Sequence, residues 1–298
     1  NEYNTGLNSE ASPMWDLWSN FYQAINTCNA AINRSSDMEG LDEETKNTRL
    51  GEVRFLRAHY YFLLVEHFGP IHLTTEETTG VQTEAQRDSE QAVYEQIVAD
   101  LEFAINNLPV SQDEFGRANR PAAKHMLSKV LLTRGYKDFG SSDDNTRAAN
   151  LAIDVIDNSP HRLLDDLESI FAYDNQQNDE VLFSVQYMQD PLFFGPGNGT
   201  HMYFRPWYEV YNGGLERIHE PGYGRPWIRF RPTAWALDNY RPLDADARFD
   251  EWFQDVWYYN SQDGIPDGAA VGDTAIWVTE QELTPSKVDD IESRIPGV

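Results

Sequence analysis

The stretch GEVRFLRAHYYFLLVEHFGPIHL, residues 51–73, is the most apolar segment of an otherwise polar, acidic sequence. Its apolar residues recur at the three-, four- and seven-residue spacings of a helix face, and further large residues widen that face. The first set is Val53, Leu56, Tyr60, Leu63 and Leu64, and the second is Phe55, Phe62, Val65 and Phe68. Gly69 and Pro70 end the pattern, because glycine caps a helix easily and proline cannot continue one. We therefore expect a helix that is buried on most sides and covered by neighbouring helices.

Further helical patterns flank this central stretch. They cover residues 13–34, residues 42 onward into the central stretch, 89–108, 120–139 and 145–158. Five amphipathic helices in sequence favour an α-helical array, because no single pair could bury its own apolar face. Two of the patterns end on the dipeptide Phe-Gly, at 68–69 and 139–140, and these endings lie 71 residues apart. That separation is close to twice the period of about 34 residues that is typical of tetratricopeptide helix pairs.

The long helical periodicity stops near residue 160. Beyond it, residues 163–171 predict one short helix, and residues 181–187 alternate like a strand. Two short helices are also expected at 234–240 and 247–256. A strand is expected at 256–260, and residues 261–298 are acidic and predicted to be loop.

Residues 190–235 are rich in glycine, proline and aromatic residues, which predicts a long loop excursion. Loops of this length inside a compact domain are usually functional. The predicted fold is therefore mainly α, a tetratricopeptide-like helical repeat array with an aromatic-rich loop excursion and minor β-structure. We expect residues 1–160 to form the helical repeat part, and residues 161–298 to form a loop-rich ligand-binding part of the same domain.

The charge of the chain excludes two classes of partner. Its 298 residues include 49 acidic and 23 basic side chains, for a formal net charge of −26. Nucleic-acid binding requires clustered Lys and Arg, and an anionic membrane surface would repel such a chain. The acid excess is typical either of adaptation to high salt or of an acidic extracellular protein. The single cysteine, Cys28, excludes an internal disulfide and is predicted to be a small buried residue.

The aromatic excursion has the composition of a sugar-binding surface. Sugar rings present apolar C–H faces and a rim of hydroxyl groups, so a site for them needs flat aromatic rings beside Arg, Asn or Asp side chains. The excursion carries eleven such candidates: Phe193, Phe194, His201, Tyr203, Phe204, Trp207, Tyr208, Tyr211, Tyr223, Trp227 and Phe230. Asn198 and the arginines at 205, 225 and 229 lie among them, and Trp15 and Trp18 are further candidates. The competing interpretation is a small satellite core that pins the loop down.

The central stretch also resembles a known family. Residues 54–73, RFLRAHYYFLLVEHFGPIHL, look like the signature helix of the SusD/RagB family of surface glycan-binding lipoproteins. Four further blocks keep the order of that family: WSNFYQAINTCNAAI at 18–32, RDSEQAVYEQIVADLEFAINNLP at 87–109, GRANRPAAKHMLSKVLLTRG at 116–135 and EVLFSVQY at 180–187. The order and spacing of five blocks are more specific than any single block. The resemblance covers residues 15–190 and thins out afterwards.

The resemblance implies a non-catalytic protein without a cofactor or metal. Such a protein binds an oligosaccharide or polysaccharide at the cell surface and delivers it to a SusC-like TonB-dependent transporter. It lies on the outward-facing surface of the outer membrane, held by a lipid anchor absent from this chain, and we expect both ends of the longer family sequence to be missing here. The glycan site of the family uses the exposed face of the helical repeat and later aromatic loops. We carry this role to Trp15, Asn20, Tyr203, Trp207 and Trp227.

Three other interpretations stay open. A peptide could be the cargo of the same type of transporter. A glycoside hydrolase would need two carboxylates about 5 to 9.5 Å apart, and the loop acids that could supply them are Glu209, Glu216, Glu220 and Asp238. A tetratricopeptide-like scaffold that binds a peptide and no sugar is the third, although it has no need of an aromatic loop.

Metal binding is a minor alternative. His59, His67 and His72 are close in sequence, but the first two lie eight residues apart on a mostly buried helix and the third lies past its end. Asp263 and Asp267 could ligate calcium, although an acidic turn is the expected role of this pair.

Overall fold

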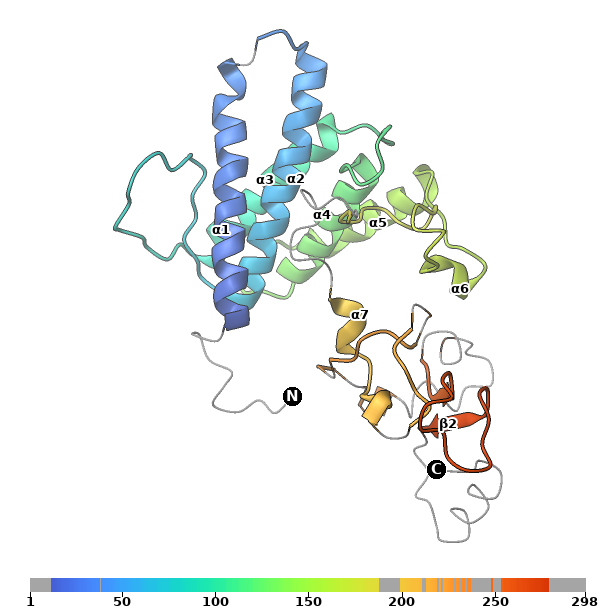
Figure 1. Cartoon of the computed structure of the whole chain (residues 1–298). Helices are drawn as coiled ribbons and strands as arrows, with labels where there is room; N and C mark the ends of the chain where they lie inside the picture. The colour runs from blue at the N-terminus through green and yellow to red at the C-terminus, as the bar shows by residue number, and fades with distance from the viewer. Residues whose placement is uncertain are drawn as a thin grey trace. The chain divides into compact units, whose positions relative to one another are not determined.

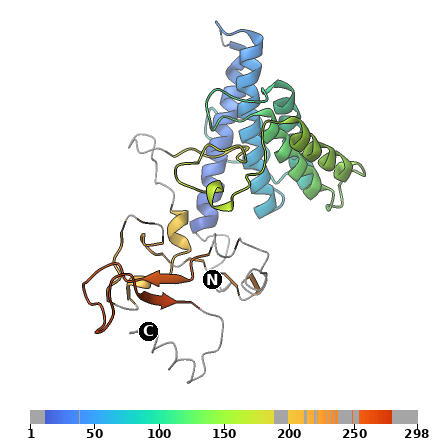
Figure 2. The same cartoon turned by 90° about the vertical axis from the view of Figure 1, so that its right-hand side faces the viewer.

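The computed structural model describes residues 12–37, 39–187, 199–210, 213–218, 220, 222–227, 229–230, 232–233, 235–236, 248 and 253–278. These residues form two compact units. The first comprises the described residues of Tyr3–Leu164 and Asn175–Gln186, and the second comprises those of Asp165–Asp174 and Tyr187–Val298. The first unit contains the long helices and the second only short elements (Figures 1 and 2). The predicted boundary at residue 160 stays a prediction.

The helical unit begins with a pair of long helices that lie side by side, α1 (Ser12–Asn33) and α2 (Glu43–Phe68) (Figure 1). The short 3₁₀ helix η1 (Arg34–Asp37) follows α1. The side chain of Asp42 accepts a 2.8 Å hydrogen bond from the Thr45 amide and so caps the start of α2. At the other end Gly69 has φ of 68° and donates its amide to Val65 O at 2.9 Å. The predicted central helix and its glycine end are therefore confirmed.

The predicted apolar residues of α2 differ in how deeply they are buried. Val53, Leu56, Tyr60 and Leu63 are partly buried, whereas Leu64 is fully buried. Phe55, Phe62 and Val65 of the predicted face are buried beside Leu64, and the core also includes Ala58 and Tyr61, which the prediction did not name. The reason is that α2 packs against α1 and α3 at once, and the sequence alone cannot show which side each neighbour covers.

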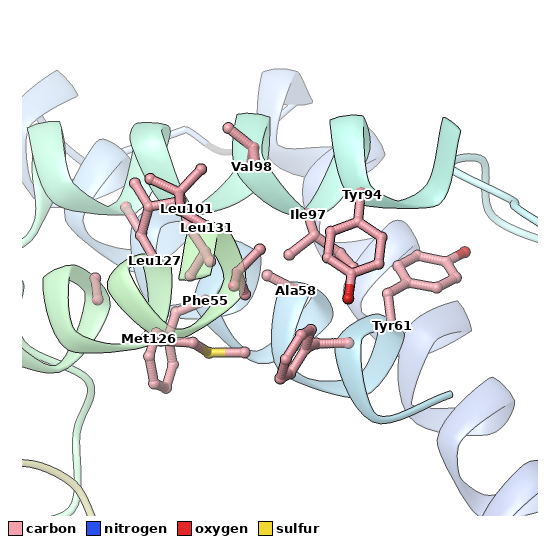
Figure 3. Close-up of a cluster of buried hydrophobic side chains, with 14 of the residues drawn as sticks. Phe55, Ala58, Tyr61, Tyr94, Ile97, Val98, Leu101, Met126, Leu127 and Leu131 are labelled. Atoms are coloured by element: carbon pink, nitrogen blue, oxygen red, sulfur yellow. The ribbon is translucent and has the colours of Figure 1, made fainter. Parts of the chain in front are cut away.

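Three more helices continue the array, each packed on the one before it: α3 (Glu90–Asn107), α4 (Arg120–Arg134) and α5 (Asp144–Asn158). Ser89 and Asn119 cap α3 and α4 with their side chains. Figure 3 shows the core that α2, α3 and α4 enclose. Its labelled side chains are Phe55, Ala58, Tyr61, Tyr94, Ile97, Val98, Leu101, Met126, Leu127 and Leu131. Cys28 is buried as predicted, and burial raises the pKa of its thiol to about 11.

The fourth helix ends earlier than predicted, at Arg134 and not at residue 139. The chain turns sharply after Arg134, and a side chain at Gly140 would place its Cβ 2.6 Å from Arg134 O. Asp144, at the start of α5, is buried and accepts a 2.8 Å hydrogen bond from Arg134 Nε. This ion pair fixes the α4–α5 corner, and the end of α4 with it.

A buried polar cluster ties α1, α2 and α3 together. Arg57 Nε donates to Asp100 Oδ2 and Arg57 Nη2 to Asp100 Oδ1, both at 2.7 Å, and Arg57 Nη1 donates to Asn29 Oδ1 at 2.8 Å. The Asn29 amide in turn donates to the carbonyl oxygens of Thr74 and Glu76 at 3.0 and 3.2 Å. The cluster therefore also holds the chain that leaves α2.

The second unit contains α6 (Leu167–Ile170), α7 (Thr200–Tyr203), the 3₁₀ helix η2 (Tyr208–Val210) and an antiparallel hairpin of β1 (Val256–Tyr258) and β2 (Thr274–Trp277). The strand predicted at 256–260 is confirmed in β1. The prediction that residues 261–298 are loop throughout was wrong, because Thr274–Trp277 form the strand β2, which pairs with β1. Burial along β2 is uneven, and Ala275 is its buried residue.

Two further predictions need correction or lie outside the described residues. Residues 181–187 form no strand, because no described segment pairs with their backbone; Phe183 of this segment packs against Phe55 of α2, with ring centroids 5.1 Å apart. The helix predicted at 247–256 is wrong at its end, where β1 begins, and most of it lies outside the described residues, as does most of 234–240. In the described part of the chain, no helix has the length and apolar character that crossing a membrane requires.

Candidate functional site

Two aromatic side chains of the loop excursion stack on each other. The Tyr203 and Trp227 ring centroids are 5.4 Å apart and their planes differ by 23°. Phe230 meets the Tyr203 ring edge-on at 6.0 Å, and Phe204 lies 5.3 Å from Phe230. We call Tyr203, Phe204, Trp227 and Phe230 the aromatic platform. Phe204, Trp227 and Phe230 keep 60%, 37% and 47% of their surface exposed, so the platform is open to a ligand.

Main-chain hydrogen bonds hold the two halves of the platform together. The Trp227 amide donates to Met202 O at 2.8 Å, and the amides of Arg229 and Phe230 donate to Tyr203 O at 2.7 and 3.0 Å. Residues 225–230 therefore run alongside the end of α7. Since these bonds use backbone groups, they place the rings without restricting which side chains the segment carries.

The glycine before α7 leaves space beside the platform. A Cβ added at Gly199 would lie 3.1 Å from Met202 Cε and 3.6 Å from both Trp227 Cζ3 and Tyr203 Oη. A side chain at this position would therefore crowd the edge of both stacked rings. The sequence signal was the glycine-rich run before residue 200, which predicted a loop but not this contact.

A small core supports the platform within the second unit. Its buried members are Tyr208, Leu215, Trp257, Tyr259 and Ala275. Tyr208 Oη donates to Gly224 O at 3.1 Å and also to Tyr223 O, while Trp257 Nε1 donates to Gly222 O at 3.2 Å. These bonds hold residues 222–224, which lead directly into the platform segment 225–230. Desolvation raises the pKa of Tyr208, so its hydroxyl stays protonated and can donate.

Two arginines lie beside Trp227. Arg225 Cζ is 5.5 Å and Arg229 Cζ is 6.0 Å from the centroid of the indole ring. Both side chains are exposed. The two arginines and Trp227 alternate along the chain, a spacing that places side chains on the same side of an extended segment. The geometry thus joins an aromatic surface to two cationic groups.

The five predicted ligand-binding residues fall in different places. Tyr203 and Trp227 are brought together in the platform. Trp207 lies in the same unit and is 51% exposed, but its ring contacts neither of them. Trp15, 64% exposed, and Asn20, also exposed, lie on α1 in the helical unit. The structure does not bring these two residues together with the platform, and their role in binding stays a prediction.

Several other aromatic candidates are core residues. Tyr208 and Tyr223 pack edge-on at 5.9 Å in the small core, as the satellite-core interpretation predicts. Trp18 is partly buried and packs between Tyr22 and Phe68, with ring centroids 4.8 and 5.1 Å away, and its role in binding stays a prediction. The side chain of His201 and residues 193, 194, 198 and 211 lie outside the described part.

The acids expected of a hydrolase are largely occupied by structural contacts. Both carboxylate oxygens of Glu209 bind the Arg217 guanidinium, and Glu216 Oε1 accepts from Ser261 Oγ at 2.7 Å. Glu220 is exposed, and Asp238 lies outside the described residues. Within the described ranges, no three His, Cys, Asp or Glu side chains gather in a way that could hold a metal ion.

Sequence reasoning missed a groove of about 520 Å³ between α3, α4 and α5 in the helical unit. Its walls carry the ion pair of Arg147 with Glu102, at 2.7 Å, and the ion pair of Lys124 with Asp154. Asn106 and Asn150 also line it. The apolar positions of these helices, on which the prediction of the helical array rests, give no signal for this groove.

Comparison with known proteins places the chain among relatives of one kind. Residues 1–132 match the family model described as "Starch-binding associating with outer membrane". The chain is 33% identical over 177 residues to a SusD-like protein of Bacteroides ovatus, covering 57% of this chain and 32% of that protein. It is 30% identical over 209 residues to the SusD-like protein P2 of Formosa agariphila, covering 64% and 40%. The chain thus spans less than half the length of these curated relatives.

Solved structures agree on the fold. A SusD superfamily protein from Parabacteroides distasonis superposes with a TM-score of 0.70 at 25% identity, covering 88% of this chain and 53% of that one. A structure described as containing a xylogluco-oligosaccharide gives a TM-score of 0.62 at 28% identity, covering 76% and 44%. The mainly helical, tetratricopeptide-like fold predicted from the sequence is therefore confirmed.

Proposed function

We propose that this chain, which is similar to SusD-like proteins in sequence and in fold, binds an oligosaccharide or polysaccharide at the cell surface without cleaving it. The observation that carries the proposal is the exposed stack of Tyr203 and Trp227. Stacked aromatic rings offer a flat apolar surface of the kind that the C–H face of a sugar ring covers. The arginines beside Trp227 supply donors for the hydroxyl groups at the rim.

The relative solved with a xylogluco-oligosaccharide supports a saccharide as the ligand class. We further propose delivery of the ligand to a SusC-like TonB-dependent transporter, and attachment to the outer membrane by a lipid anchor. The matching family model, described as associating with the outer membrane, supports the location, while the transporter and the anchor are what the resemblance to the family implies. A peptide as cargo is the nearest alternative.

Absence of cleavage is the second part of the proposal. Both carboxylate oxygens of Glu209 are occupied by the Arg217 guanidinium, so neither oxygen is free to act on a glycosidic bond. Glu216 is engaged by Ser261. The relatives reported above are glycan-binding or SusD-like by description, and none is described as an enzyme.

The test is binding of the whole chain to a panel of soluble polysaccharides by affinity electrophoresis, with the recovered glycans sized afterwards. We expect retention by at least one glycan and no shortening of its chains. Trp227→Ala should weaken the retention, and Trp277→Ala is the matched control, because Trp277 is 43% exposed in the same unit but lies on β2. Shortened chains would overturn the proposal in favour of a hydrolase. Binding of peptides and of no glycan would show that the ligand is a peptide.

A further inference from the structure

Two exposed arginines beside the aromatic platform form no ion pair with a described carboxylate. They share this with Arg87 of the helical unit, and what distinguishes them is their common position beside Trp227. The arginines that form ion pairs are Arg34, Arg49, Arg54, Arg57, Arg117, Arg134, Arg147, Arg162 and Arg217. Within the described part of the chain, Arg225 and Arg229 pair with no carboxylate, although both are exposed.

Both of these arginines converge on the same tryptophan. Their Cζ atoms lie 5.5 and 6.0 Å from the Trp227 centroid, near the outer limit of about 6 Å for a cation–π contact. Such loose contacts hold the guanidinium groups beside the ring and leave their N–H donors available. Each guanidinium presents a planar fork of donors that fits a carboxylate or sulfate oxygen pair.

From this arrangement we infer that the aromatic platform takes a saccharide bearing an acidic group, a carboxylate or a sulfate, which Arg225 and Arg229 bind while the sugar ring lies on the platform. The inference rests on the proposed function and names the substrate class of the same site. The net charge of −26 does not oppose it, because at physiological salt charges beyond about 8 Å are largely screened.

The experiment compares ligands that differ only in charge. Oligogalacturonate is set against its methyl ester, and κ-carrageenan oligosaccharide against its desulfated form, with xyloglucan oligosaccharide as a neutral probe. Titration calorimetry with the whole chain should show binding of at least one acidic member about tenfold or more above its neutral counterpart, falling as salt is raised. The two pairs tell a carboxylate from a sulfate.

Matched variants assign the effect to the two arginines. R225Q and R229Q should each weaken binding of the preferred acidic glycan about tenfold and binding of the neutral probe by clearly less, because the glutamine amide still offers N–H donors to hydroxyl groups but no positive charge to an acid. Arg87→Gln is the control, because Arg87 is exposed in the helical unit and its loss changes the net charge equally. Circular dichroism should show all three variants folded.

Each outcome decides between the two proposals. Equal binding of charged and neutral members, or an equal loss in the Arg87 variant, would overturn the acidic-ligand inference and leave glycan capture standing. Binding of polyglutamate as tight as that of the acidic glycans would also overturn it, because charge alone would then suffice. Binding of no saccharide at all would overturn the proposed function as well.

Discussion

The indole of Trp227 stacks on the phenol ring of Tyr203, with centroids 5.4 Å apart and planes 23° from parallel. The pair lies on a loop excursion that the sequence predicts, yet no periodicity links its two members. Backbone bonds between residues 202–203 and 227–230 bring them together. The stack is thus a property of the folded loop.

Removal of the Trp227 indole should lower glycan affinity while changing the stability of the fold only a little. Trp227→Ala should weaken glycan affinity by roughly 1 to 3 kcal/mol, because an aromatic ring at the centre of a contact carries much of the binding energy. Stability should fall by about 1 kcal/mol, the value of a stacked aromatic pair. Calorimetric titration and urea unfolding measure the two quantities. A stability loss without any loss of affinity would instead make Trp227 a core residue.

The stability of the second unit, which carries the aromatic platform, should depend on the absence of a side chain at Gly213. A Cβ at Gly213 would clash with the carbonyl oxygen of Gly264, and the neighbouring Gly214 donates its amide to Asp263 O at 2.7 Å. We expect Gly213→Ala to cost about 1 to 3 kcal/mol in the second unit, since backbone atoms must shift. Near-ultraviolet circular dichroism and glycan affinity should both change, while the helical signal stays.

Gly80→Ala is the control for this substitution, because a Cβ at Gly80 meets nothing within 4 Å. Its effect on stability should stay within about 0.5 kcal/mol. If Gly213→Ala behaved like the control, the close approach of Gly213 to Gly264 would not be a constraint on the fold.

The sequence predicts the helical unit well for physical reasons. Capping residues such as Asp42, Ser89 and Asn119 mark the helix starts, and apolar periodicity marks the helices themselves. These signals are local. The end of α4 was missed because it depends on the tertiary ion pair of Arg134 with Asp144, which no local pattern encodes.

The candidate site was predicted less completely. Its composition pointed to the right loop, and Tyr203 and Trp227 were among the candidates. The grouping of Arg225 and Arg229 around Trp227 depends on loop conformation, which turn residues permit but do not specify. Tyr208 could not be told from a ligand contact, because aromatic residues serve cores and platforms equally well.

The buried ion pair of the helical unit should be costly to break. Arg57 is 2% and Asp100 0% exposed, and two hydrogen bonds of 2.7 Å join them. Asp100→Ala leaves an uncompensated buried charge and should destabilise the fold by about 3 to 5 kcal/mol in urea unfolding. The exposed pair of Arg162 and Asp179 provides the comparison: Asp179→Ala should cost less than about 1 kcal/mol. Similar losses in both variants would contradict a special role for burial.

One histidine should make stability depend on pH between about 5 and 7. Burial first, and the charge of Lys129 second, lower the pKa of His59 in the folded state. The unfolded chain, with the ordinary value of about 6.5, then binds the proton more readily as the pH falls. Stability from this source is complete above pH 7 and declines as the pH drops below 6.5, because the unfolded state carries more protons there.

The variant His59→Gln isolates this contribution, because carboxylates with ordinary values near 4 titrate at lower pH. The free energy of unfolding, measured in urea at pH 5, 6, 7 and 8, should rise with pH between 5 and 7 more steeply in the unmodified chain than in the variant. Equal slopes in the unmodified chain and the His59 variant would show that His59 is not held neutral by burial in α2.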